Sequence, residues 1–191
     1  MGGKNMTNKK TFIIIVCAFA AAINIVLGTL VAQLKIPLIF LDTIGTIFAA
    51  IYFGPLYGAT VGAVSNIITG MIFSPKDIPF FLVNVVVGLI VGYIVKKYSY
   101  SLTTAVVTGL ILSVICPLIG SPIAIWLYGG VTGSGNDFLV LLLRQTGSDI
   151  FTSTFIPRIT GNIVDKVVSA VLVWALIKKL PTQYKPEINN V

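Results

Sequence analysis

The sequence predicts an all-α membrane protein, a compact bundle of six transmembrane helices with both termini in the cytoplasm. Of its 191 residues, 56% are hydrophobic and only 10% are charged, whereas soluble domains carry about 25% charged residues. The mean hydropathy is +0.99. So few polar groups cannot cover a water-exposed surface of this size, and we expect lipid to surround most of the protein.

Six apolar stretches are candidates for helices that cross a hydrocarbon layer about 30 Å thick. They lie at residues 11–34, 37–53, 56–74, 78–95, 102–128 and within 149–177. The first stretch contains no charged residue, and the second contains one, Asp42, near its start. Gly54-Pro55 separates the second from the third because this pair breaks a helical pattern. The turn SPKDIP then closes the third stretch.

The last three stretches end at different signals. The fourth ends at Lys96-Lys97, and the sixth ends at Lys178-Lys179. The fifth is long and contains two prolines, and the glycine-rich segment YGGVTGSGND after it predicts a loop. Residues 138–143, FLVLLL, are too short to span a membrane and predict an interfacial helix or a lid.

The lysines predict the topology. If the N-terminus is cytoplasmic, the cytoplasmic side holds eight of them: Lys4, Lys9, Lys10, Lys96, Lys97, Lys178, Lys179 and Lys185. The outer side then holds only Lys35, Lys76 and Arg144, as the positive-inside rule requires. We therefore expect cytoplasmic tails at residues 1–10 and 180–191 around a membrane domain at 11–179. The net charge of +7 forms no basic stripe, which argues against nucleic acid as a partner.

The composition also restricts the chemistry. The chain has no histidine, which excludes a Ser-His-Asp triad and a histidine-ligated metal. Its two cysteines, Cys17 and Cys116, lie in apolar stretches and indicate no disulfide framework. The phosphate-binding pattern GxxxxGK[ST] is absent. We therefore expect a protein that is not an enzyme and has no cofactor and no metal site.

The sixth stretch contains charged and polar residues that a lipid environment disfavours. Arg158, Asn162, Asp165 and Lys166 share one helix face, and each charge costs about 2.5–3.5 kcal/mol at mid-membrane on insertion scales. This face must therefore contact protein or a water-filled cavity. We predict that Arg158 and Asn162 contact a ligand. For Asp165 and Lys166, ligand contact and an internal ion pair both remain open.

Other polar and aromatic residues near the outer ends of the stretches are weaker candidates. Asn84 faces either a pocket or a neighbouring helix. Trp126 and Tyr128 form either an interfacial aromatic belt or a stacking platform for a flat ligand. For Asp42, stabilisation of a helix N-terminus is the favoured reading. The complete set of expected substrate-binding residues is Asn84, Trp126, Tyr128, Arg144, Asp149, Arg158, Asn162 and Asp165.

Small residues recur at intervals of four. Gly54, Gly58 and Gly62 follow this spacing, and Gly88 and Gly92 repeat it in the fourth stretch. Such patterns let helix backbones approach closely, so they predict packing seams. Ala18 and Ala22 give the same spacing in the first stretch, where packing within the bundle and docking of another membrane protein are both open.

The order of these features resembles the substrate-binding S component of energy-coupling factor (ECF) transporters. Residues 41–70, with GPLYGATVG as their most specific part, are similar to the second and third helices of that family. PRITGNIVDKVVSAVLVWAL, at 157–176, is similar to its last helix. The resemblance covers essentially the whole chain.

The resemblance implies the function and the partners. The protein would be the high-affinity binding subunit of a vitamin or micronutrient uptake system in a prokaryotic plasma membrane. It would work with a transmembrane coupling subunit, docked on Ala18 and Ala22, and two cytoplasmic ATPases. The pocket would open outward among the fourth to sixth helices and the outer loops. A riboflavin-like, thiamine-like, pantothenate-like or cobalamin-precursor substrate would each fit. The alternative is a small ion-coupled secondary transporter, with Asp165 as its coupling carboxylate.

Overall fold

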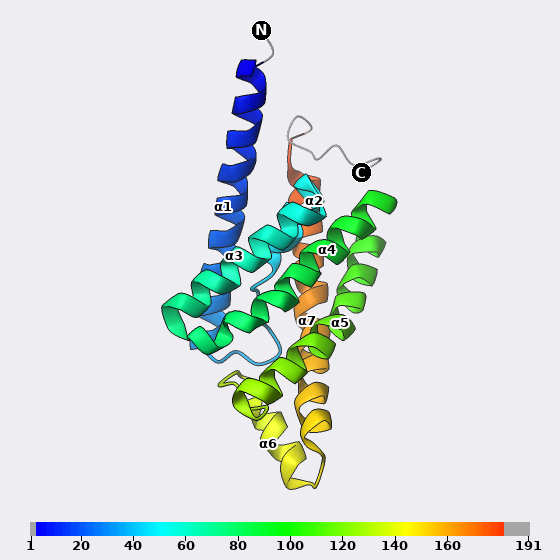
Figure 1. Cartoon of the computed structure of the whole chain (residues 1–191). Helices are drawn as coiled ribbons and strands as arrows, with labels where there is room; N and C mark the ends of the chain where they lie inside the picture. Colours follow the sequence, from blue (N-terminus) through cyan, green and yellow to red (C-terminus); the bar gives the residue numbers. More distant parts are fainter. Residues whose placement is uncertain (1–2, 182–191) are drawn as a thin grey trace.

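The computed structural model describes the backbone of residues 3–181 and the side chains from residue 9 onward. Residues 1–2 and 182–191, which belong to the two expected tails and include Lys185, lie outside the described residues. The described part contains helices and connecting segments but no strand (Figure 1). Its elements are α1 (Gly3–Gln33), α2 (Ile44–Phe53), α3 (Pro55–Phe73), the 3₁₀ helix η1 (Pro75–Phe80), α4 (Phe81–Lys97), α5 (Leu102–Tyr128), α6 (Asp137–Gln145) and α7 (Ile150–Lys179).

Five helical segments are long and apolar enough to cross a membrane, which confirms the all-α membrane fold. They are Lys9–Gln33, Pro55–Phe73, Pro75–Lys97, Leu102–Tyr128 and Ile150–Lys179. They correspond to five of the six predicted stretches. The two prolines of the fifth stretch lie inside α5 without ending it. The FLVLLL segment lies in the short helix α6.

The second predicted stretch is only partly helical, so the expectation of one helix over residues 37–53 was wrong. Its helix, α2, has 10 residues, and residues 34–43 form an irregular segment that we call the strap. Pro37 disfavours helix in the residue before it, and Lys35, Leu38 and Leu41 have positive φ angles of 48°, 65° and 52°. Non-helical backbone in a membrane protein is tolerated where it is buried in protein or lines a water-filled cavity, so that its polar groups find partners. Here a side chain of α7 is such a partner, as described below.

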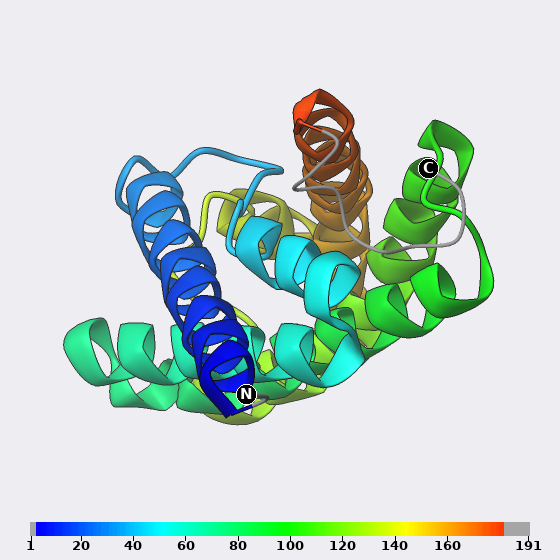
Figure 2. The same ribbon diagram turned by 90° about the horizontal axis from the view of Figure 1, so that it is seen from above.

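The helices surround α2, which contacts α1, α3, α4 and α7. The most extensive contacts are between α5 and α7, followed by those between α3 and α4. Figure 2 shows the short α2 inside the bundle, with α1 on one side and α7 on the other. Among the helices, α1 contacts only α2 and α3, so much of its surface is left uncovered by the described residues.

The two ends of the bundle differ in charge. The beginning of α1, the end of α4 and the end of α7 lie at the same end of the molecule, and α6 lies at the opposite end (Figure 1). Lysine pairs therefore gather at one end: Lys9-Lys10, Lys96-Lys97 and Lys178-Lys179. We call this the lysine end.

The glycine repeats form packing seams, as the sequence predicts. A Cβ atom added to Gly88 of α4 would lie 2.2 Å from the backbone nitrogen of Ala59 in α3, and one added to Gly92 would lie 2.3 Å from the Cα atom of Pro55. On α3, a Cβ at Gly58 would lie 2.5 Å from the Cβ of Ala50 in α2. The helix backbones thus touch directly. Gly54 serves a different purpose from the other glycines. Its φ angle of 105° is not helical, so α2 ends before it and α3 begins after it at Pro55.

We expect Gly88→Ala to destabilise the protein by about 1–3 kcal/mol, the usual cost of overpacking, because the new methyl group would meet backbone atoms that cannot move aside. Thermal unfolding of the detergent-solubilised protein measures the effect. Gly120→Ala is the matched control, since a Cβ there meets nothing closer than a side-chain atom of Val83 at 3.6 Å. Equal stability of the two variants would contradict the close packing of α3 and α4.

Candidate functional site

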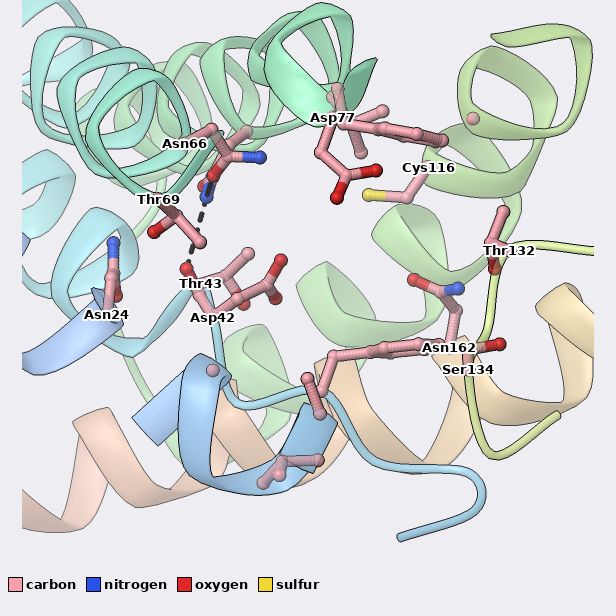
Figure 3. Close-up of a pocket in the computed structure, with 18 of the residues that line it drawn as sticks. Asn24, Asp42, Thr43, Asn66, Thr69, Asp77, Cys116, Thr132, Ser134 and Asn162 are labelled. Atoms are coloured by element: carbon pink, nitrogen blue, oxygen red, sulfur yellow. Dashed lines mark hydrogen bonds between the residues drawn. The ribbon is translucent and has the colours of Figure 1, made fainter. Parts of the chain in front are cut away.

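A cavity of about 310 Å³ lies between α1, the strap, α3, α4, α5, α7 and the loop after α5 (Figure 3). Its size is at the lower end of the range of about 300–1,000 Å³ that is typical of small-molecule sites. Figure 3 shows Asp42, Asp77 and Asn162 around one opening, with the sulfur of Cys116 directed toward it. The fourth to sixth membrane helices of the expectation correspond to α4, α5 and α7, which line the cavity with the loop after α5, and α1, the strap and α3 also supply its wall.

The structure brings three of the eight expected substrate-binding residues to the cavity wall: Asn84, Arg158 and Asn162. The other five do not line it: Trp126, Tyr128, Arg144, Asp149 and Asp165. The side chain of Trp126 is 79% exposed and points outward. The hydroxyl of Tyr128 donates to Asp77 at 2.8 Å, which connects the end of α5 to η1.

Arg144 and Asp149 are exposed at the end that carries α6. Asp149 is the N-terminal cap of α7, where its carboxylate accepts hydrogen bonds from the backbone of Thr152 at 3.0 Å and Phe151 at 2.9 Å. Hydrogen bonds from Thr152, followed by that from Phe151, lower the pKa of this carboxyl. The role of Asp149 in the structure is therefore to begin a helix.

Several polar residues of the wall were not among the expected set. Asn66 and Thr69 face the cavity from α3, Asp42 and Thr43 from the strap, and Thr132 from the loop after α5. On α3 the spacing of three residues is a visible signal, because it places Asn66 and Thr69 on one helix face. The spacing of the strap residues gave no such signal, because the apolar sequence of residues 37–53 predicts a helix there.

Asn84 is the centre of a buried polar network. Its amide donates to the carbonyl of Asp42 at 3.1 Å and to the side chain of Asn66 at 2.8 Å, and its oxygen accepts from Thr46 at 2.8 Å. Asn24 of α1 extends the network by donating to Thr46 at 2.9 Å and to Ser65 at 3.1 Å. The network joins α1, α2, α3, α4 and the strap, so both readings of Asn84 apply: it packs between helices and it faces the cavity.

Asp165 and Lys166 form an internal ion pair, one of the two alternatives left open by the sequence. The Lys166 ammonium lies 2.6 Å from Asp165 and 3.3 Å from Asp42, and it donates to the Thr43 hydroxyl at 3.2 Å. Asp165 is fully buried, and its other oxygen accepts hydrogen bonds from the backbone N–H groups of Phe40 and Leu41, both at 2.8 Å. The acceptor of these two strap amides is therefore a side chain of α7.

Arg158 is a buried cation with unused hydrogen-bonding capacity. Its side chain is 9% exposed and lines the cavity. One terminal nitrogen donates to Thr132 at 3.3 Å, and the other is buried without a partner. No carboxylate among the described residues lies within 4.0 Å of it. The amide of Asn162 donates to the Arg158 carbonyl at 2.8 Å. A buried charge without a partner is strongly unfavourable, so this position suits a ligand that offers an acceptor.

The family model of the ECF-type riboflavin transporter, S component, matches residues 8–182. The chain belongs to this family. No curated protein matches the chain. The family assignment confirms the resemblance that the sequence indicated, and it makes this S component a substrate-binding subunit of a membrane transporter and not an enzyme. S components of ECF transporters bind vitamins and work with a transmembrane coupling subunit and ATPases.

In this S component we expect Asn84→Ala to lower the free energy of unfolding by about 1–3 kcal/mol, because it removes the acceptor of the Thr46 hydroxyl and the amide that donates to the Asp42 carbonyl. Thermal unfolding without ligand measures the change. Asn66→Ala is the matched control: Asn66 is half-buried and accepts only one of these bonds, so a smaller loss is expected. A larger loss at Asn66 than at Asn84 would contradict the central place of Asn84.

Proposed function

We propose that this S component binds riboflavin in the cavity between α7 and the strap and delivers it to an ATP-driven coupling module. The observation that carries the proposal is the free donor of buried Arg158 in the cavity of a chain from the riboflavin-type family. Riboflavin has a flat ring system with carbonyl oxygens and a chain of hydroxyl groups. It needs apolar surface for the ring, and donors and acceptors for its edges.

The cavity offers both kinds of surface. Ile36, Ile39, Phe40, Phe80 and Val83 supply apolar and aromatic contacts for a flat ring. We assign the unpartnered nitrogen of Arg158 to a substrate oxygen and the amide oxygen of Asn162 to a substrate N–H or hydroxyl group. The side chain of Asn84 also lines the cavity. High affinity would follow from burying the ring while pairing Arg158, which, of the two cations on the cavity wall, is the one without a carboxylate within 4.0 Å among the described residues.

The orientation follows from the charges. We propose that the lysine end is cytoplasmic, as the positive-inside rule favours, and that the cavity opens to the outside. The strap and α2 together then make one crossing. With the five long segments this gives six crossings and places both tails in the cytoplasm. The membrane would be the plasma membrane of a prokaryote.

The exposed side of α1 is the proposed docking surface for the coupling subunit. Ala18 and Ala22 are both exposed, and among the helices α1 touches only α2 and α3. Two small residues one turn apart permit a second helix to approach closely. The coupling subunit would connect this S component to two cytoplasmic ATPases.

An ion-coupled secondary transporter is less well supported. Its coupling carboxylate would be Asp165, which must exchange an ion with a water-filled path. Asp165 is fully buried, does not line the cavity and uses both oxygens on protein partners.

We expect the detergent-solubilised protein to bind riboflavin, with quenching of the vitamin's fluorescence as the signal. Arg158→Ala should weaken binding about ten- to a hundred-fold, because it removes a charge-assisted hydrogen bond of about 1.5–3 kcal/mol. Lys76→Ala, which removes an exposed cation outside the cavity, should leave the dissociation constant unchanged. A folded Arg158→Ala protein with wild-type affinity would refute the assigned role of Arg158. A wild-type protein that binds another vitamin but no riboflavin would refute the substrate.

Replacing Ala18 and Ala22 together by tryptophan should abolish copurification with a coupling subunit, because two bulky side chains prevent close helix approach. The dissociation constant for riboflavin should stay nearly unchanged, since neither residue lines the cavity. If the complex persists, this face of α1 is not the docking surface. If riboflavin binding is lost as well, α1 holds the bundle together and the two functions are not separable.

A further inference from the structure

We propose that Asp165 is a positioning residue of the substrate site: its carboxylate fixes the strap as one wall of the cavity without touching the substrate. This inference rests on the proposed function only for its effect on riboflavin; the contact with the strap is independent of the ligand. It gives the intramembrane acid a role other than substrate contact or ion coupling.

The contacts of Asp165 all go to elements that form the cavity. One oxygen accepts the two consecutive strap amides, Phe40 and Leu41. The other oxygen contacts Lys166, which also reaches Asp42 and Thr43 at the end of the strap. A single side chain of α7 therefore holds the strap by its backbone directly and by its side chains through Lys166.

The strap needs such an anchor because its backbone is unfavourable on its own. Two leucines, Leu38 and Leu41, have the positive φ values that side-chain-bearing residues rarely adopt. A conformation of this kind persists only when its surroundings determine it. Besides Asp165, Asn136 accepts a hydrogen bond from the Leu38 amide at 3.0 Å. The close approach of Gly135 to the carbonyl of Lys35 supports the same conformation, since a Cβ there would lie 2.7 Å from that oxygen.

The strap in turn shapes the cavity. Ile36, Ile39, Phe40, Asp42 and Thr43 all line it. The two amides anchored on Asp165 lie among these residues, so a shift of the anchored backbone moves apolar and polar wall residues together. The position of Asp165 therefore determines the shape of the site that the substrate meets.

A carboxylate is required for this task and an amide is a poor substitute. Asp165 accepts three hydrogen bonds, two from the strap and one from Lys166. An asparagine has one acceptor oxygen, so its NH₂ group would face either the two strap amides or the lysine ammonium, donor against donor. Asp165→Asn thus weakens the anchor while hardly changing the volume.

The test is hydrogen–deuterium exchange of the ligand-free, detergent-solubilised protein, read by mass spectrometry on peptides that cover residues 36–43. We expect these amides to exchange at least tenfold faster in Asp165→Asn than in wild type, with other segments unchanged. Tyr100→Phe is the matched control, because it removes a buried hydrogen bond to the carbonyl of Ala170, also in α7, away from the cavity. The strap should exchange at the wild-type rate in this control.

The second measurement is the dissociation rate of riboflavin, which should rise about tenfold in Asp165→Asn and stay unchanged in Tyr100→Phe. Strap exchange that is unchanged in a folded Asp165→Asn protein overturns the proposal. Faster strap exchange with an unchanged dissociation rate also overturns it, since the conformation of the strap would then have no effect on how long riboflavin stays bound. If wild type binds no riboflavin, the proposed function fails, and the exchange experiment alone decides whether Asp165 holds the strap.

A double variant keeps the test valid if Asp165→Asn does not fold. Asp165→Leu together with Lys166→Met removes both buried charges at once, a replacement that is often neutral or stabilising. The two strap amides then have no acceptor, and we expect the same local increase in exchange. Wild-type exchange rates at residues 36–43 in this variant would overturn the proposal.

Discussion

The amides of Phe40 and Leu41 lie outside any helix, so another part of the protein must supply their hydrogen-bond acceptor. The carboxylate of Asp165 does this, and Lys166 keeps that buried carboxylate neutralised. Because this acceptor exists, the chain can leave the helical conformation before α2 and form a cavity wall from the strap. Without this acceptor the two amides would be unpaired, and the cavity would lose the wall that the strap forms.

The remaining elements are placed around this wall by two kinds of contact with different consequences. Glycine seams bring α3, α4 and α2 into backbone contact, which leaves no space between them. The network around Asn84 and Asn24 joins the same helices to α1 and to the strap through directional bonds. The seams determine how close the helices lie, and the network determines their register. The cavity lies between these elements and α5 and α7.

The sequence predicted the features that follow from local composition. Long apolar stretches located the five long segments, and Arg158 and Asn162 stood out because lipid disfavours them. The strap could not be found in this way, because its apolar residues read like a helix and its acceptor is 124–125 residues away in the chain. The sequence shows that Trp126 lies near the outer end of α5, which is why it was expected at the site. It does not show which face of the helix carries the side chain, and in the structure that face is exposed.

The side of the cavity formed by α5 has a property that the other sides lack. It consists of Cys116, Pro117 and Gly120, and an added Cβ at Gly120 would meet only a side-chain atom at 3.6 Å. The depth of the cavity on this side is therefore limited by the size of small side chains and not by touching backbones. A lineage of such proteins could narrow or reshape its pocket here by single substitutions, and so change ligand preference, while the seams that maintain the bundle stay intact.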